Sequence, residues 1–73
     1  MSRIAALGEA VKVEGFALAG ALVLAAEDAT DVDAAWTALP DDVAVLILTT
    51  RAADRLGERL DERPRLITVV GLE

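Results

Sequence analysis

The stretch from Val43 to Thr50 constrains the fold more than any other part of the chain. It reads Val-Ala-Val-Leu-Ile-Leu-Thr-Thr and follows a turn signal at Pro40-Asp41-Asp42. A short run that is apolar at nearly every position is typical of a strand buried on both faces, and such strands occur mostly in parallel sheets covered by helices. We therefore expect this stretch to be a central strand of a parallel sheet.

Strand-like and helix-like segments alternate around it. We expect further strands at residues 3–8, 21–26 and 66–70, a loop at 9–12, and helices at 13–20, 30–39 and 51–63. This order, β-α-β-α-β-α-β, predicts a small three-layer α/β domain spanning residues 1–73. Because crossovers between parallel strands are right-handed, the flavodoxin-like strand order 2-1-3-4 is favoured.

That topology leaves part of the sheet uncovered. The second and third helices would share one face, and the first helix would be alone on the other. No helix of this chain would then cover the second face over strands three and four. An exposed apolar patch of several hundred Å² usually marks a partner surface. We expect a partner or a second copy there.

The periodicity of the helical segments predicts which side chains point inward. In the first, we expect Phe16, Ala19 and Leu18 to point toward the sheet. In the second, Thr30 is a credible N-cap with Asp33 in a capping-box position. The apolar face of the second helix consists of Val32, Ala35, Trp36 and Leu39, and that of the third consists of Ala53, Leu56, Gly57 and Leu60.

Composition narrows the function classes. The chain has neither cysteine nor histidine, so it lacks thiolate metal ligands and the commonest general base. Its net charge is −6, which disfavours nucleic acids and anionic membranes as partners. The longest apolar run, residues 15–26, is shorter than the roughly 20 residues of a membrane span. We see no signal peptide and expect a soluble chain.

Two polar clusters are candidates for a small-molecule or metal site. The switch point between strands one and three would be lined by Gly8, Glu9, Ala10, Thr49, Thr50 and Arg51, but threonines there also serve as helix caps. The acidic residues Glu27, Asp28, Asp31 and Asp33 match no calcium-loop pattern and are usual around a helix start. We therefore expect no catalytic residue, no cofactor and no metal.

A row of arginines is the most distinctive surface feature of the sequence. Arg51, Arg55, Arg59 and Arg63 recur every four residues on the third helix. Such a row can be a solvated face with local ion pairs, or a docking face for an acidic helical partner. Both interpretations stay open from the residues alone.

The expected first strand ends at Gly8, and a short motif follows at Gly15, Phe16, Ala17, Leu18, Ala19 and Gly20. These features resemble the F subunits of V-type and archaeal-type rotary ATPases, in which the first strand ends at a glycine and a G-F-x-L-A-G element opens the first helix. The resemblance covers nearly the whole chain. The central strand, the charged helix after it and Pro64 are also similar. Family members continue into a C-terminal segment, whereas this sequence stops right after its fourth expected strand.

The resemblance implies a non-catalytic central-stalk subunit without a cofactor. Such a subunit packs against the coiled-coil shaft subunit on the cytoplasmic side, reaches the membrane only through the complex, and supports coupling of ATP turnover to ion transport. The alternative is a receiver-like interaction module. It is disfavoured because Thr49 stands where a phospho-acceptor Asp is needed. A third class, a small ligand-binding or enzymatic domain, lacks catalytic side chains.

Overall fold

The computed structural model describes residues 2–72, and of Leu72 the backbone only. The two short helices α1 and α3 are each continued by a 3₁₀ helix, labelled η1 and η2. The elements in order are β1 (Arg3–Gly8), α1 (Ala10–Val13), η1 (Glu14–Ala19), β2 (Leu22–Ala25), α2 (Ala29–Ala38), β3 (Val43–Thr49), α3 (Thr50–Leu56), η2 (Gly57–Glu62) and β4 (Ile67–Leu72).

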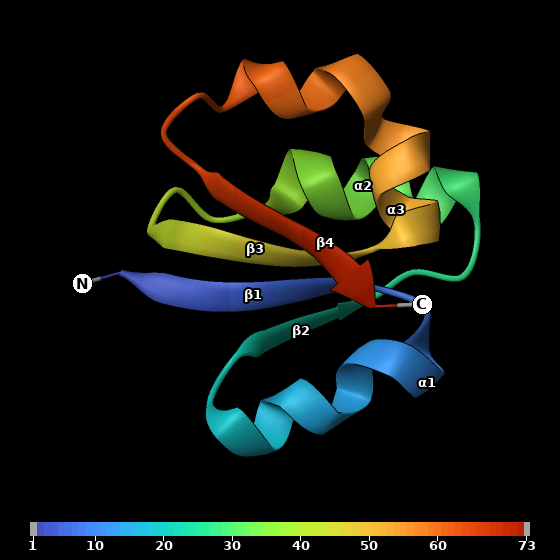
Figure 1. The fold of residues 1–73 in the computed structure, drawn as a ribbon, viewed down its shortest axis with the longest axis vertical. Coiled ribbons are helices and arrows are strands. Elements are labelled where there is room, and N and C mark those ends of the chain that lie inside the picture. The colour runs from blue at the N-terminus through green and yellow to red at the C-terminus, as the bar shows by residue number, and fades with distance from the viewer. Residues whose placement is uncertain (1, 73) are drawn as a thin grey trace.

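The four strands form one parallel sheet in the order β2-β1-β3-β4. Figure 1 shows α2 and α3 on one side of the sheet and α1 on the other. The predicted α/β class, strand order and distribution of helices are therefore confirmed. Given this strand order, right-handed crossovers explain where the helices lie, because the crossover from β1 to β2 moves across the sheet in the opposite direction to the two that follow it.

The main core lies between the sheet and the pair α2 and α3. In the register, Leu7 of β1 lies opposite Leu48 of β3, and both are fully buried. The predicted face of α2 contributes Val32, Trp36 and Leu39 to the same core. The apolar periodicity of α2 was thus a reliable guide, because only one side of that helix can reach the sheet.

The other face of the sheet is covered only in part. Ala6 of β1 and Val13 of α1 are fully buried there. Val45 and Ile47 of β3, which alternate with the buried Leu46 and Leu48, are only half-buried. The expectation that β3 is buried on both faces is wrong at these two positions, because α1 and η1 do not extend over β3.

The first helix begins earlier than the sequence predicts. Residues 10–12 are helical and not part of a loop, because the Glu27 carboxylate accepts a 2.9 Å hydrogen bond from the first helical N–H, that of Ala10. Phe16 is half-buried, as expected. Leu18 is 96% exposed and Ala19 is exposed, so the prediction that they point inward is wrong. The 3₁₀ geometry of η1 rotates them away from the face that a regular α-helix would present.

The third helix is interrupted where the sequence predicts continuity. Gly57 has a φ of +50° and ends α3, and the chain continues as η2. Gly57 is exposed, whereas Ala52, which the periodicity missed, is fully buried. A positive φ is readily adopted only by glycine, so the backbone turn explains this residue better than an inward position does.

The N-cap of α2 is Asp28 and not Thr30. The Asp28 carboxylate accepts a 2.8 Å hydrogen bond from the N–H of Asp31, while Thr30 lies inside the first turn. Asp28→Ala is expected to lower the free energy of unfolding by about 1 kcal/mol, because that N–H then loses its partner. Thr30→Ala is the matched control and is expected to change stability by less than about 0.5 kcal/mol. Urea unfolding followed by circular dichroism measures both, and equal losses would contradict this assignment.

Candidate interaction surface

The uncovered part of the sheet carries an apolar patch over three adjacent strands. The register aligns Ile4, Val45 and Ile67 in one row across β1, β3 and β4, and Ile47 and Val69 in the next. Alternation along each strand puts all five on the α1 side of the sheet. Ile67 is 61% exposed, Ile4 50% and Val69 49%. We call these five residues the bare sheet face. The predicted uncovered region is therefore present.

The α1–η1 segment stands beside this face as a ridge. A groove of about 440 Å³ runs along it, lined by Ser2, Arg3, Ile4, Phe16, Ala19, Gly20, Ala21 and Ile47. Phe16 and Ala19 belong to the G-F-x-L-A-G element, so this element borders the groove. Of the bare sheet face, only Ile4 and Ile47 line this groove, and η1 forms one wall.

The glycines of the first helical segment have different roles. Gly20 has a φ of +85° and ends η1, as expected for a helix stop. An added Cβ at Gly15 would meet nothing within 4 Å. Leu18 is almost completely exposed to solvent. The fold itself therefore explains Gly20 but does not require Gly15 or Leu18.

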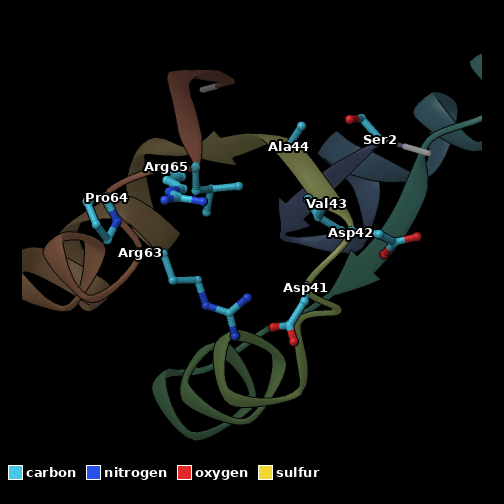
Figure 2. Close-up of a pocket in the computed structure, with 9 residues that line it drawn as sticks. Ser2, Asp41, Asp42, Val43, Ala44, Arg63, Pro64 and Arg65 are labelled. Atoms are coloured by element: carbon cyan, nitrogen blue, oxygen red, sulfur yellow. The ribbon is translucent and has the colours of Figure 1, made fainter.

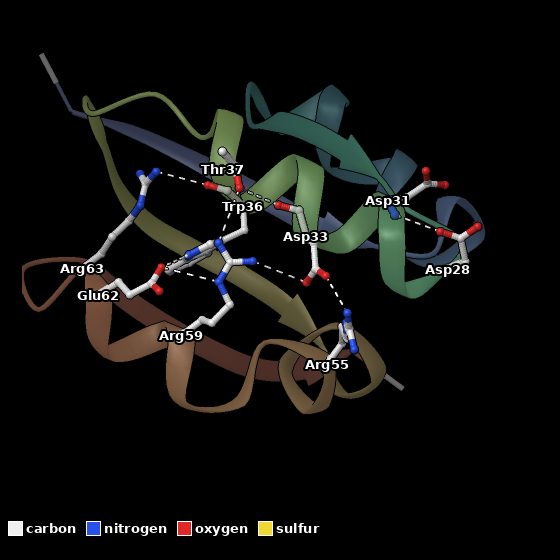
Figure 3. A network of polar contacts seen from close by, with 9 residues as sticks. All are labelled: Asp28, Asp31, Asp33, Trp36, Thr37, Arg55, Arg59, Glu62 and Arg63. Carbon is white, nitrogen blue, oxygen red and sulfur yellow. Dashed lines mark hydrogen bonds and ion pairs between the residues drawn. The ribbon is translucent and has the colours of Figure 1, made fainter.

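The arginine row mainly faces α2. Arg55 forms a 2.6 Å ion pair with Asp33, and Arg59 lies 3.5 Å from the same carboxylate (Figure 3). The local pairs expected along the third helix are reduced, within residues 2–72, to Arg59 with Glu62 at 3.6 Å. Asp33 of α2 therefore binds both Arg55 of α3 and Arg59 of η2. The hydrogen bond from Arg55 lowers the pKa of Asp33 below its ordinary value.

Arg63 is also bound to α2. Its guanidinium donates to the carbonyl oxygens of Trp36 and Leu39 at 3.1 and 3.0 Å, and it lies 5.1 Å from the centre of the Trp36 ring. The Trp36 Nε1–H donates to Glu62 at 2.9 Å. The two hydrogen bonds from Arg63 satisfy carbonyl oxygens at the end of α2 that have no partner within the helix. Sequence reasoning missed this, because the partners are more than 20 residues apart.

The switch point between β1 and β3 is closed by its own side chains. The Thr49 hydroxyl donates to Glu9 Oε1 at 2.8 Å and accepts from the Ala52 N–H at 3.2 Å. Lys12 lies 3.2 Å from the other Glu9 oxygen. Thr49 is therefore a helix cap, as threonines at this place often are. Only about 150 Å³ of open space remains at this end, lined by Glu9, Ala26, Glu27, Asp28, Ala29, Val32, Arg51 and Arg55.

The Glu9 carboxylate is expected to contribute to the acid sensitivity of the fold. The hydrogen bond from Thr49 lowers the pKa of Glu9 below its ordinary value of 4.5. A carboxylate with a lowered pKa stabilises the fold above the unfolded pKa, and this contribution is lost as the pH falls through the folded value. Glu9→Gln is therefore expected to flatten the fall of the free energy of unfolding below about pH 4.5. Urea unfolding between pH 7 and pH 3 tests this. If the free energy of unfolding fell equally steeply with pH in both proteins, the titration of Glu9 would not be the cause of the loss of stability in acid.

A larger hollow lies at the opposite end of the sheet. It measures about 570 Å³ between the loop before β3 and the loop before β4, and Figure 2 shows its lining. The residues are Ser2, Asp41, Asp42, Val43, Ala44, Arg63, Pro64, Arg65 and Leu66. The side chains carry both charges, and Arg3 binds Asp42 through a 2.8 Å ion pair nearby.

Two further observations concern membranes and metals. Within residues 2–72, no helix is both long and apolar enough to cross a bilayer. In the same part of the chain, no three acidic side chains come together as a metal site requires. Asp28 and Asp33, which the sequence offers as candidate ligands, are a helix cap and an ion-pair partner.

The comparisons with known proteins identify the family. Neither the comparison with curated proteins nor that with solved structures gave a match. The family model described as "ATP synthase (F/14-kDa) subunit" matches residues 4–71. That range includes the bare sheet face, the G-F-x-L-A-G element and the arginine row. The chain therefore belongs to the family of ATP synthase F/14-kDa subunits.

Proposed function

We propose that this chain is a non-catalytic subunit of the central stalk of a V-type rotary ATPase/ATP synthase. There it packs on the coiled-coil shaft subunit and supports the coupling of ATP turnover to ion transport. Membership in a family of ATP synthase subunits supports a place in such a complex. The observation that carries the proposal is the bare sheet face, because an aliphatic surface of this kind is typical of an assembly component.

The chemistry of the polar groups supports a role without catalysis or cofactor. The chain has no histidine and no cysteine. At the switch point, where doubly wound sheets usually bind ligands, Glu9 and Thr49 are hydrogen-bonded to each other. A bound ligand would have to break these contacts.

The same proposal gives the chain a cytoplasmic place at the periphery of the membrane. It would touch the membrane only through the rest of the complex. Its net charge of −6 suits this, since an anionic lipid surface would repel it.

The arginine row stays a proposed partner-binding surface. Three of its members already contact α2, so Arg51 is the member with which the proposal is best tested. Arg51→Glu would weaken binding of a partner at this row without removing a contact between α2 and α3. Charge reversal at both Arg55 and Arg59 would also remove the ion pairs with Asp33, so unfolding must be measured beside binding.

Co-purification with the shaft subunit tests the proposed function. A tagged form of this chain, expressed with the shaft subunit, is expected to bring it down in a one-to-one complex. The two nucleotide-binding subunits without the shaft serve as the control and are expected to bind less. Failure of the shaft subunit to bind, with both proteins folded by circular dichroism, would contradict the proposal.

A further inference from the structure

The outer edge of β4 has none of the usual shields of a strand edge along most of its length. Among residues 2–72, β4 pairs only with β3, so no strand lies beside the backbone groups on its other side. The segment Ile67–Leu72 contains neither a charged residue nor a proline. Residues 67–71 are all exposed, including Val70, which points to the helix-covered side of the sheet. Natural proteins usually protect such an edge with charges, proline, a covering segment or a very short strand.

The opposite edge of the sheet is protected in this way. It is formed by β2, which is only four residues long, Leu22–Ala25. The first three of these residues are partly buried, because α1 and η1 lie against this strand. The edge of β4 is therefore the one to which another strand can add by main-chain hydrogen bonds.

Symmetry restricts how the β4 edges of two copies can join. A closed pair of identical edges is related by a two-fold axis, and this axis makes the two strands antiparallel. Residues that oppose each other in an antiparallel pair point to the same face of the sheet, so their numbers differ by an even number. One residue of β4 must therefore face its own counterpart at the axis.

The shape of β4 selects Thr68 as that residue. The register with β3 shifts after Val70, so Gly71 is an extra residue and the strand is regular only before it. With Thr68 at the axis, Ile67 of each copy faces Val69 of the other, and the opposed pairs lie before the bulge. With Val69 at the axis, Ile67 would have to face Gly71 in the bulge.

We propose that two copies of this chain pair through β4, antiparallel and with Thr68 on the two-fold axis, so that their four-stranded sheets become one continuous sheet. The two Thr68 hydroxyls then lie opposite each other, and threonine pairs of this kind stabilise antiparallel strands. On the other face, two pairs of Ile67 with Val69 join the bare sheet faces of both copies. The pairing closes the free edge. It goes beyond the stalk function proposed above and does not depend on it.

The charge of the chain is compatible with this pairing. Each copy carries a net charge of −6, but the paired segment itself is uncharged. Arg65, just before the strand, would lie about 20 Å from its counterpart, beyond the Debye length of about 8 Å at physiological salt. The ladder is short and buries less than the about 1,000 Å² of a stable interface, so we expect a weak dimer that forms above roughly 0.1 mM.

Single cysteines measure the register. The chain has no cysteine, so Thr68→Cys, Val69→Cys and Val70→Cys each provide one thiol. In the proposed pair, the Cα atoms of position 68 are about 5 Å apart, those of position 69 about 8–9 Å and those of position 70 about 14 Å. A disulfide requires less than about 7 Å. With oxidised glutathione, Thr68→Cys is expected to cross-link at least about tenfold faster than the valine variants, after correction for the reactivity of each thiol.

Charge pairs test the same contact without a cross-link. Thr68→Lys sets two ammonium groups against each other at the axis, and Thr68→Glu sets two carboxylates, so each variant alone is expected to raise the dimer Kd at least about fivefold. An equimolar mixture of the two is expected to pair at least as well as the unmodified chain. Thr30→Lys adds the same charge at an exposed position of α2 and is the matched control, expected to change Kd less than about twofold.

Sedimentation velocity between about 10 μM and about 1 mM measures the dimer, and thermal unfolding confirms that each variant folds. A chain that stays monomeric throughout, and whose three cysteine variants cross-link equally, overturns the pairing. Fastest cross-linking at position 69 or 70 overturns the register. A strand of another protein that binds this edge, while the chain alone stays monomeric, overturns the second copy as occupant. Binding of the shaft subunit by Thr68→Lys is measured separately, and its loss or retention concerns the proposed function and not the pairing.

Discussion

Trp36→Ala is expected to leave most of the protein unfolded at 25 °C. The indole is 1% exposed at the centre of the core between the sheet, α2 and the segment after α3. Replacing a buried tryptophan by alanine costs about 3–5 kcal/mol, because the transfer free energy is lost and a cavity remains. A domain of this size rarely has more than about 3–5 kcal/mol of stability in total. Urea unfolding followed by circular dichroism measures the loss.

Trp36→Phe is the control for this experiment. It keeps most of the apolar volume but loses the hydrogen bond from Nε1 to Glu62. We expect it to fold and to be less stable by about 1–2 kcal/mol. Equal losses for alanine and phenylalanine would mean that the bond to Glu62, and not the buried volume, holds α2 in place.

Gly8→Ala is expected to lower the free energy of unfolding by about 2–3 kcal/mol. An added Cβ would lie 2.8 Å from the Cβ of Thr49, and closer still to its methyl group and hydroxyl. Thr49 cannot move aside easily, because it is fully buried and its hydroxyl contacts Glu9 and the Ala52 N–H. The backbone of Gly8, with a φ of +158°, adds strain for any other residue.

Gly15→Ala is the matched glycine control. Its Cβ would point into open space, in a helical segment with a negative φ. Alanine is the better helix former, so we expect no loss and a gain of up to about 1 kcal/mol. Thermal unfolding of the two variants gives the comparison. A loss at Gly15 as large as that at Gly8 would contradict the role assigned to the contact with Thr49.

The sequence predicted where the candidate surface lies on the sheet, but it misplaced a side chain of the helical segment beside that surface. The uncovered face over β3 and β4 follows from counting three crossover helices against four parallel strands, and Ile67 and Val69 are exposed there as expected. The same reasoning put Leu18 inside, where it is 96% exposed. The difference is physical, because a period of 3.6 residues was assumed for a segment that is 3₁₀-helical after its first turn.

The amino-acid sequence by itself determined the alternation of strands and helices, the parallel sheet and its strand order. Apolar periodicity is written locally, and the handedness of crossovers holds for all L-amino-acid chains, so neither needs long-range contacts to be read. Only the tertiary structure decided that Asp33 binds Arg55 and Arg59, that Asp28 rather than Thr30 caps α2, and that Thr49 fills the space beside Gly8. Such choices depend on which of several equally suitable side chains the packed elements bring within a few Å of each other, and residue order alone does not contain that distance.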